Sequence, residues 1–480
     1  MSSEWPVIAP PANPEQPAPE RRTLIVKPIF TYPLTTRRRQ TSWRNWGGIE
    51  TEDHVNREVA QIERELEELK SRADFPLRFL PIAKVRGAAQ LSTGDDVAKA
   101  DALLFYAAGD GAGDLMGEVN GIERLGKDTI FFVRHQSGPL YYWYEGVSAR
   151  FLRQHTDAPA TKTILCDDVV VDRLDDVLWR LRALAGLRAT AGSRILAIGP
   201  RNLRAWPPAE TIDEVARLWK LDVETVPFQS LGKLLRDARS DRQTVSLARR
   251  RAEAYLRLSG TTLETELRFV HNAFLLEQVL RKLMREADCR AITLAACMSA
   301  IIPIAETTAC LSLSVLNDAG YLALCEADFV AIPAAMLLGN ISGLPTFMNA
   351  PTFPHDGLIT LGHCTAPRKV DGKSLSPARI MTHFESDYGA APKVEMPLGQ
   401  PVTVVVPDFA SKRWLGFSGE VESNPSYAIC RTQVDVRFEA PSQTVAARMP
   451  GYRSVLIYGN YLRETGYALR RVPIAWDCLG

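Results

Sequence analysis

Short apolar segments alternate with amphipathic segments through the first 350 residues of the chain. Six segments rich in branched apolar residues have the length and character of buried strands: residues 23–30, 77–82, 102–107, 129–133, 194–199 and 291–294. Apolar residues also recur at three- and four-residue intervals, as in residues 50–72, which predicts helices with one buried face. This alternation is typical of a layered α/β fold.

The pattern changes after residue 350, where short apolar segments are separated by Gly, Pro and Asn turns. Such a pattern predicts a β-rich region. We therefore predict an α/β chain that ends in a β-rich domain. Its predicted parts are a flexible proline-rich extension (1–20), an N-terminal α/β domain (21–190), a central α/β domain that carries acidic site residues (191–350) and the β-rich domain (351–480).

Composition and charge indicate which kinds of binding partner to expect. The 57 basic and 56 acidic residues give a net charge of +1, which offers no bulk attraction to nucleic acid or to an anionic membrane. The longest apolar runs are too short to cross a bilayer, which predicts a soluble protein. The eight cysteines contain no C-x-x-C pair and most lie in apolar segments, which favours a reducing, cytoplasmic location.

Two carboxylates, Glu326 and Asp328, stand one residue apart between apolar segments. A carboxylate buried without a partner is costly, so this pair needs a cation or hydrogen-bond donors. One interpretation is a metal site. The other is that the two acids cap the helix that follows and offset its dipole.

Two further residues could join these acids. Glu306 follows an apolar run, and His363 lies 35 residues after Asp328. Carboxylates together with an imidazole suit Mn²⁺ or Mg²⁺ better than a thiolate-preferring ion. His355 and His383 are further candidate ligands, although both lie in polar sequence typical of solvated loops. Cys325 and Cys364 have the character of small buried side chains.

Several segments occur in an order that resembles the superfamily of L-fucose isomerase and L-arabinose isomerase. They are Ser314-Val-Leu-Asn-Asp-Ala-Gly320, Cys325-Glu-Ala-Asp328, Ser342-Gly-Leu-Pro-Thr-Phe347, His363-Cys364, Cys430-Arg-Thr-Gln433 and Tyr458-Gly-Asn460. The similarity is densest between residues 295 and 365 and near the C-terminus. The first 190 residues share only the α/β pattern.

The resemblance implies two Rossmann-like α/β domains before the β-rich domain, and interconversion of an aldose and a ketose with a divalent metal, typically Mn²⁺. By position, Glu306 and Asp328 match the catalytic acids that also bind the metal, and His363 is a candidate third ligand or substrate contact. Glu326 and Asn349 are the further candidates for binding a small-molecule sugar. A metal that bridges two sugar oxygens would stabilise an enediolate while a carboxylate moves the proton.

The sequence departs from the family pattern at Tyr461, where the family has a metal-binding histidine. Tyrosine is a poor ligand for Mn²⁺ at neutral pH. Two alternatives to isomerisation therefore stay open: elimination or carbon–carbon cleavage of a sugar derivative at the same centre, and sugar binding without catalysis. The resemblance also implies a homo-oligomer, a trimer or hexamer.

Overall fold

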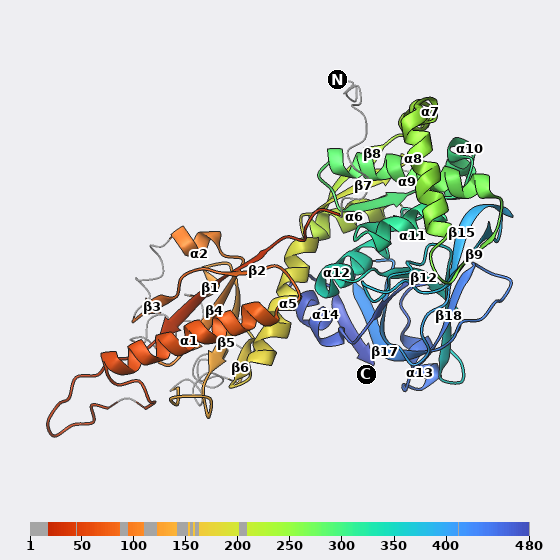
Figure 1. The fold of residues 1–480 in the computed structure, drawn as a ribbon. Helices are drawn as coiled ribbons and strands as arrows, with labels where there is room; N and C mark the ends of the chain where they lie inside the picture. The colour runs from red at the N-terminus through yellow and green to blue at the C-terminus, as the bar shows by residue number, and fades with distance from the viewer. Residues whose placement is uncertain are drawn as a thin grey trace. The chain divides into compact units, whose positions relative to one another are not determined.

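The structure is a computed structural model that describes residues 18–44, 46–86, 95–109, 122–141, 152–153, 157–158, 163–200, 209–410 and 412–479 (Figure 1). The chain forms two compact units. The small unit is Arg21–Arg188, and the large unit is Ala189–Gly480 together with the N-terminal twenty residues. Most of the predicted proline-rich extension lies outside the described residues.

The small unit is built on a parallel sheet in which β1 lies between β2 and β4, followed by β5 and β6, while β3 pairs with the far half of β1. Its strands are β1 (Leu24–Thr31), β2 (Leu77–Phe79), β3 (Ala83–Val85), β4 (Ala102–Ala107), β5 (Asp128–Val133) and β6 (Val169–Val171). Its helices are α1 (Glu52–Arg72), α2 (Asp95–Lys99), the 3-10 turn η3 (Cys166–Asp168) and α5 (Leu174–Thr190). The predicted strands at 23–30, 102–107 and 129–133 are confirmed as β1, β4 and β5.

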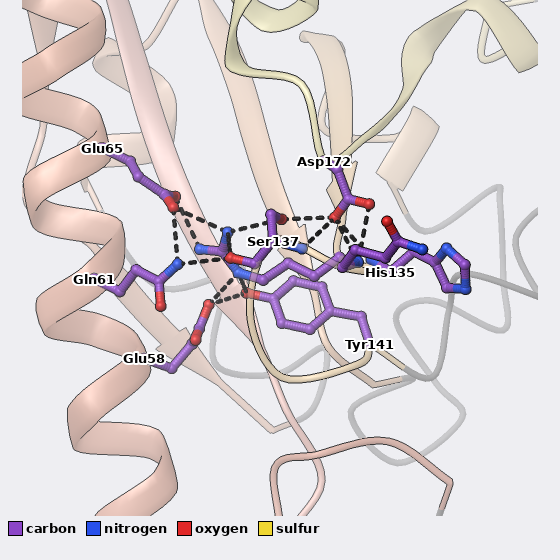
Figure 2. A network of polar contacts seen from close by, with 9 residues as sticks. Glu58, Gln61, Glu65, His135, Ser137, Tyr141 and Asp172 are labelled. Carbon is purple, nitrogen blue, oxygen red and sulfur yellow. Dashed lines mark hydrogen bonds and ion pairs between the residues drawn. The ribbon is translucent and has the colours of Figure 1, made fainter.

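A fully buried arginine ties α1 to this sheet. The guanidinium of Arg134, which follows β5, donates from Nε to Glu58 at 2.6 Å and from Nη1 and Nη2 to Glu65 at 2.9 and 2.8 Å. Tyr141 donates its hydroxyl to the same Glu58. Figure 2 shows Glu58 and Glu65 extending from α1 toward this network. Because the charges are buried and mutually compensated, removal of one of them leaves the others unpaired.

We predict that Arg134→Met lowers the unfolding free energy of the small unit by about 3–5 kcal/mol, because two buried carboxylates lose their cation. Amide hydrogen exchange in β4 and β5 measures this effect. The matched control is Arg173→Met, since Arg173 is 73% exposed and pairs with Asp176 at the surface. Equal protection of β4 and β5 in the two variants would contradict the prediction.

The large unit contains a second parallel sheet, in the order β11-β10-β7-β8. Its strands are β7 (Arg194–Ile198), β8 (Asp222–Val226), β10 (Ala291–Leu294) and β11 (Leu322–Cys325). The helices around it are α6 (Ala209–Trp219), α7 (Phe228–Ser240), α8 (Arg242–Leu256), α9 (Leu267–Glu286), the π-helical turn η4 (Cys297–Ile301), α10 (Ile302–Ala305), α11 (Cys310–Asp318) and α12 (Ile332–Ser342). The strand order reverses between β7 and β10, and open α/β sheets bind ligands beyond the carboxyl ends of strands at such a point.

The remaining strands of the large unit form a barrel-like, mainly antiparallel sheet and a three-stranded sheet. The barrel-like sheet has the order β16-β19-β12-β13-β18-β17-β20 and is closed by pairing of β16 with β17. Its strands are β12 (Phe347–Pro351), β13 (Leu358–His363), β16 (Pro401–Pro407), β17 (Arg413–Ser423), β18 (Thr432–Arg437), β19 (Ser454–Tyr458) and β20 (Ala475–Leu479), with helices α13 (Ser442–Arg448) and α14 (Leu462–Leu469) between them. The smaller sheet joins β15 (Tyr388–Val394), β14 (Ala378–His383) and β9 (Thr261–Glu264).

The predicted α/β class is thus confirmed in its general form, as two parallel sheets and one antiparallel, barrel-like sheet. The Rossmann-like arrangement and the division at residue 350 stay predictions. Among the described residues, no single helix has the length and apolar character needed to cross a membrane. Only the bent pair Cys297–Ala305 and Cys310–Asp318, whose halves meet at 86°, has both properties when taken together.

Polar residues of α11 hold two segments that lead into the large unit's site. The side chain of Asn317 makes two hydrogen bonds with the backbone of Ala323 in β11, both at 2.8 Å. Ser314 donates its hydroxyl to the carbonyl of Ala366, which lies three residues after the end of β13. The segment 314–320 that carries part of the family resemblance therefore positions backbone around the site.

Asp318, the last residue of α11, is a half-buried acid in the same segment. Its Oδ1 accepts the backbone N–H groups of Arg368 and Lys369 at 2.8 and 2.7 Å. Burial raises the pKa of Asp318 to about 6, although these two hydrogen bonds act in the opposite direction. Because the pKa is higher in the folded chain than in the unfolded chain, folding favours the protonated acid.

The stability contributed by Asp318 is therefore complete below about pH 4 and is lost as the pH rises to about 6. We predict that the unfolding free energy of Asp318→Asn, relative to that of the parent chain, increases by up to about 3 kcal/mol over this interval. Denaturant unfolding of the two proteins at a series of pH values measures the difference. The matched control is Asp371→Asn. Burial alone would raise the pKa of Asp371, but hydrogen bonds from Lys373 and Ser374 outweigh it and lower the pKa. The difference in unfolding free energy between this control and the parent chain should therefore stay constant over the interval. A flat difference for Asp318→Asn would contradict the prediction.

Candidate functional site

Unusual backbone conformations gather beyond the carboxyl ends of β10 and β11. Ala296, Glu306, Glu326 and Ala327 all have positive φ angles, between 47° and 65°. Non-glycine residues rarely adopt this left-handed conformation, and such strain concentrates at binding and catalytic sites. The π-helical turn η4 directly follows Ala296, and π-helical turns are also frequent at functional sites. These features mark the carboxyl edge of the sheet as the candidate site.

Arg453 joins the two acids that follow β11. Its Nε donates to Asp328 Oδ2 at 3.1 Å, and its Nη2 forms an ion pair with Glu326. The hydroxyl of Tyr452 donates to the same Oδ2 at 3.2 Å. Asp328 is only 1% exposed, whereas the side chain of Glu326 is 37% exposed. A guanidinium from the start of β19 thus compensates one buried and one accessible carboxylate.

Asp328 also acts on the helix that follows. Its Oδ1 accepts the N–H of Val330 at 3.1 Å, and its carbonyl accepts the N–H groups of Ala331 and Ile332 as α12 begins. The N-cap of α12 is Ala331 and no side chain among the described residues caps the helix, so the helix-capping interpretation is wrong for α12; the Asp328 side chain holds the turn that precedes it. The cation that the burial of Asp328 requires is supplied in this structure by Arg453.

His363, the last residue of β13, completes this cluster. Its Nε2 lies 4.0 Å from Glu326 Oε1, and its Nδ1 lies 3.0 Å from the Thr365 hydroxyl. Burial, reinforced by the positive charge of Arg453, lowers the pKa of His363 to about 3. The imidazole is therefore neutral at physiological pH.

Burial also shifts the pKa values of Asp328 and Tyr452. Burial raises the pKa of Asp328, and the charge of Glu326 adds to this effect, while Arg453 opposes it. Burial and the charge of Asp328 raise the pKa of Tyr452 to about 12, so its hydroxyl stays a donor. The cluster thus combines a permanent cation, a neutral imidazole, a phenol donor and two carboxylates.

Asn349 and Glu306 have other partners. Asn349 is fully buried in β12, where it donates to the Phe347 carbonyl at 2.9 Å and accepts from the Ser454 hydroxyl. The side chain of Glu306 is 59% exposed and pairs with Arg239 at 3.3 Å. The structure therefore brings Glu326, Asp328 and His363 together but leaves Glu306 paired with an arginine of α7.

The three predicted Mn²⁺ ligands do not fit a metal as they lie. Among the described residues, the one group of three metal-binding side chains with ligand atoms within 4.8 Å of one another contains none of Glu306, Asp328 and His363. Both oxygens of Asp328 already accept hydrogen bonds from protein groups. Mn²⁺ at these residues stays a prediction from the resemblance.

A cluster of thiols borders the carboxylates. The Sγ atoms of Cys310 and Cys364 lie 3.3 Å apart. Cys297 forms side-chain hydrogen bonds with Cys310 and with Cys325, which lower the pKa of the Cys297 thiol. Cys430 forms a similar bond with Cys364. Five of the eight cysteines therefore converge, although they come from five separate segments.

His383 lies beside these thiols. It ends β14 and is 7% exposed, so the prediction of a solvated loop histidine is wrong for this residue. His355 is exposed, as predicted. Tyr461 lies before α14, where its backbone N–H donates to Thr403. Sequence reasoning missed Arg453 and the thiol cluster, because neither has a short-range motif.

Comparison with protein-family models and with curated proteins finds no match for this chain. The resemblance to sugar isomerases consequently remains an inference from the matching segments. The function has to be inferred from the geometry around Glu326, Asp328, His363 and Arg453.

Proposed function

We propose that the large unit is a sugar isomerase-like enzyme that interconverts an aldose and a ketose, with Glu326 moving the proton between adjacent carbons. The observation that carries this proposal is the accessible carboxylate of Glu326, held against Arg453 above the buried Asp328. The ordered segments that resemble the fucose and arabinose isomerases support the same reaction class.

Glu326 suits the role of the general base because it is the accessible member of the acidic pair. A base has to reach a C–H bond of the substrate, and Glu326 is by far the more accessible of the two acids. The ion pair with Arg453 and the left-handed backbone fix the carboxylate in position. Asp328 is the positioning residue, since it accepts a hydrogen bond from Nε of Arg453 while Nη2 pairs with Glu326.

Arg453 and His363 suit the two remaining tasks of an enolisation. Removal of a proton from the carbon next to a carbonyl places negative charge on the carbonyl oxygen, and a fixed guanidinium stabilises that charge. The neutral imidazole of His363 can give a proton to one oxygen and take one from its neighbour. The proton that Glu326 takes from C2 returns to C1, so the reaction is balanced without a redox partner.

We predict that Glu326→Gln lowers turnover at least about a hundredfold, because the amide cannot accept the proton. The assay follows a panel of aldoses in deuterated water by NMR, where isomerisation places deuterium at C1 or C2. The matched control is Glu422→Gln, which removes a surface carboxylate that is 45% exposed and pairs with Arg437. Full activity of Glu326→Gln would contradict the proposal.

The same assay separates the alternatives. Loss of a carbon or an oxygen from the product would indicate cleavage or elimination. Binding of a sugar without turnover, with or without added Mn²⁺, would indicate a non-catalytic sugar-binding protein. Dependence of turnover on Mn²⁺, abolished in Asp328→Asn, would support the metal site that the resemblance implies.

A further inference from the structure

We propose that Cys310, Cys364 and His383 bind a single thiophilic divalent ion of the zinc class. This site is separate from the carboxylate cluster and from the Mn²⁺ site that the resemblance implies. It does not depend on the proposed isomerase activity.

The three ligand atoms already surround one point. They all lie within 4.8 Å of one another, and the two sulfur atoms are 3.3 Å apart. Around a tetrahedral zinc with Zn–S bonds of about 2.3 Å, ligand atoms are separated by roughly 3.5–4 Å. The sulfur atoms are too far apart for a disulfide, which requires about 2.05 Å. A single ion could therefore be bound after side-chain shifts of about 1 Å or less.

The three side chains of this group are buried, which favours binding of a cation. Cys310, Cys364 and His383 are 1%, 5% and 7% exposed. The ring of His383 is held at Nδ1 by the Ser386 hydroxyl, 3.1 Å away, and metal-binding histidines are commonly held through such an outer hydrogen bond. Sulfur is a weak hydrogen-bond donor and acceptor, so the contact between the two thiols compensates little for their burial.

Cys297 is a candidate fourth donor, although it lies outside the group of three whose ligand atoms are within 4.8 Å of one another. Cys297 forms a side-chain hydrogen bond with Cys310 and interacts electrostatically with His383. It lies in the π-helical turn η4, directly after the left-handed residue Ala296. If the Cys297 thiol moved into this group, the set would become three thiolates and one imidazole, a combination typical of structural zinc sites.

The chemistry of the donors selects the ion. Thiolate and imidazole ligands favour Zn²⁺ and related soft ions, whereas Mn²⁺ and Mg²⁺ prefer oxygen. An iron–sulfur cluster would separate the cysteine sulfurs by its own width, but Cys310 and Cys364 are in contact. A single zinc ion therefore fits better than a cluster. It would link the start of α11 to the ends of β13 and β14.

Metal analysis of the purified full-length chain, loaded with Zn²⁺ and then dialysed, tests this site. We expect about one zinc per chain, and replacement by Co²⁺ should give the intense thiolate-to-cobalt absorption that oxygen ligands do not produce. Cys310→Ser, Cys364→Ser and His383→Gln should each weaken retention at least about a hundredfold, since even outer-shell substitutions cost ten- to a hundredfold. The matched control is Cys166→Ser, which removes an exposed cysteine.

Three outcomes would overturn the proposal: no thiolate-to-cobalt absorption in the parent chain, unchanged zinc retention in Cys310→Ser and Cys364→Ser, or a Cys310–Cys364 disulfide in the freshly purified protein. The cobalt spectrum of the parent chain tests for thiolate ligands even if a variant fails to fold. Glu326→Gln should keep its zinc whether or not it is active, so failure of this site and failure of the proposed reaction are distinguishable.

Discussion

Asp328 lies at the end of β11 where water cannot reach it, so a cation within hydrogen-bonding distance is a condition of the fold. Arg453 meets this condition from the start of β19 and thereby connects the parallel sheet of the large unit with its barrel-like sheet. The accessible Glu326 shares the same guanidinium. The geometry of the candidate active site therefore depends on an interaction that also holds the two sheets together.

The two donor sets in this region differ in chemical hardness. Carboxylates and a guanidinium suit polar, oxygen-rich ligands, whereas the adjoining thiols suit a soft cation. Both sets contain buried polar groups. In the carboxylate set an arginine compensates the buried charge, whereas in the thiol set the sulfur atoms contact one another. The two donor sets would therefore select different ligands, although they occupy neighbouring positions.

Local patterns in the sequence predicted much of the secondary structure, because strands such as β4 and helices such as α1 are determined by nearby apolar residues. The acidic pair and His363 were also found from sequence. Glu306 was expected beside them, but it ends α10 in a left-handed conformation and pairs with Arg239. Arg453 and the thiol cluster could not be found, because their partners are distant along the chain and meet only through the pairing of strands. The prediction that His383 is a solvated loop residue is wrong, because the polar residues around it belong to strand β14.

His363 and Cys364 are consecutive residues that serve different neighbours: the imidazole lies near Glu326, and the thiol lies against Cys310. Glu326 and Cys325 are likewise adjacent, and interaction with the Cys297 side chain raises the pKa of the Cys325 thiol. A shift of either backbone segment therefore moves both donor sets together. Thermodynamic linkage then requires reciprocity: by whatever factor an ion at the thiols changes the affinity for a sugar, the sugar changes the affinity for the ion by the same factor.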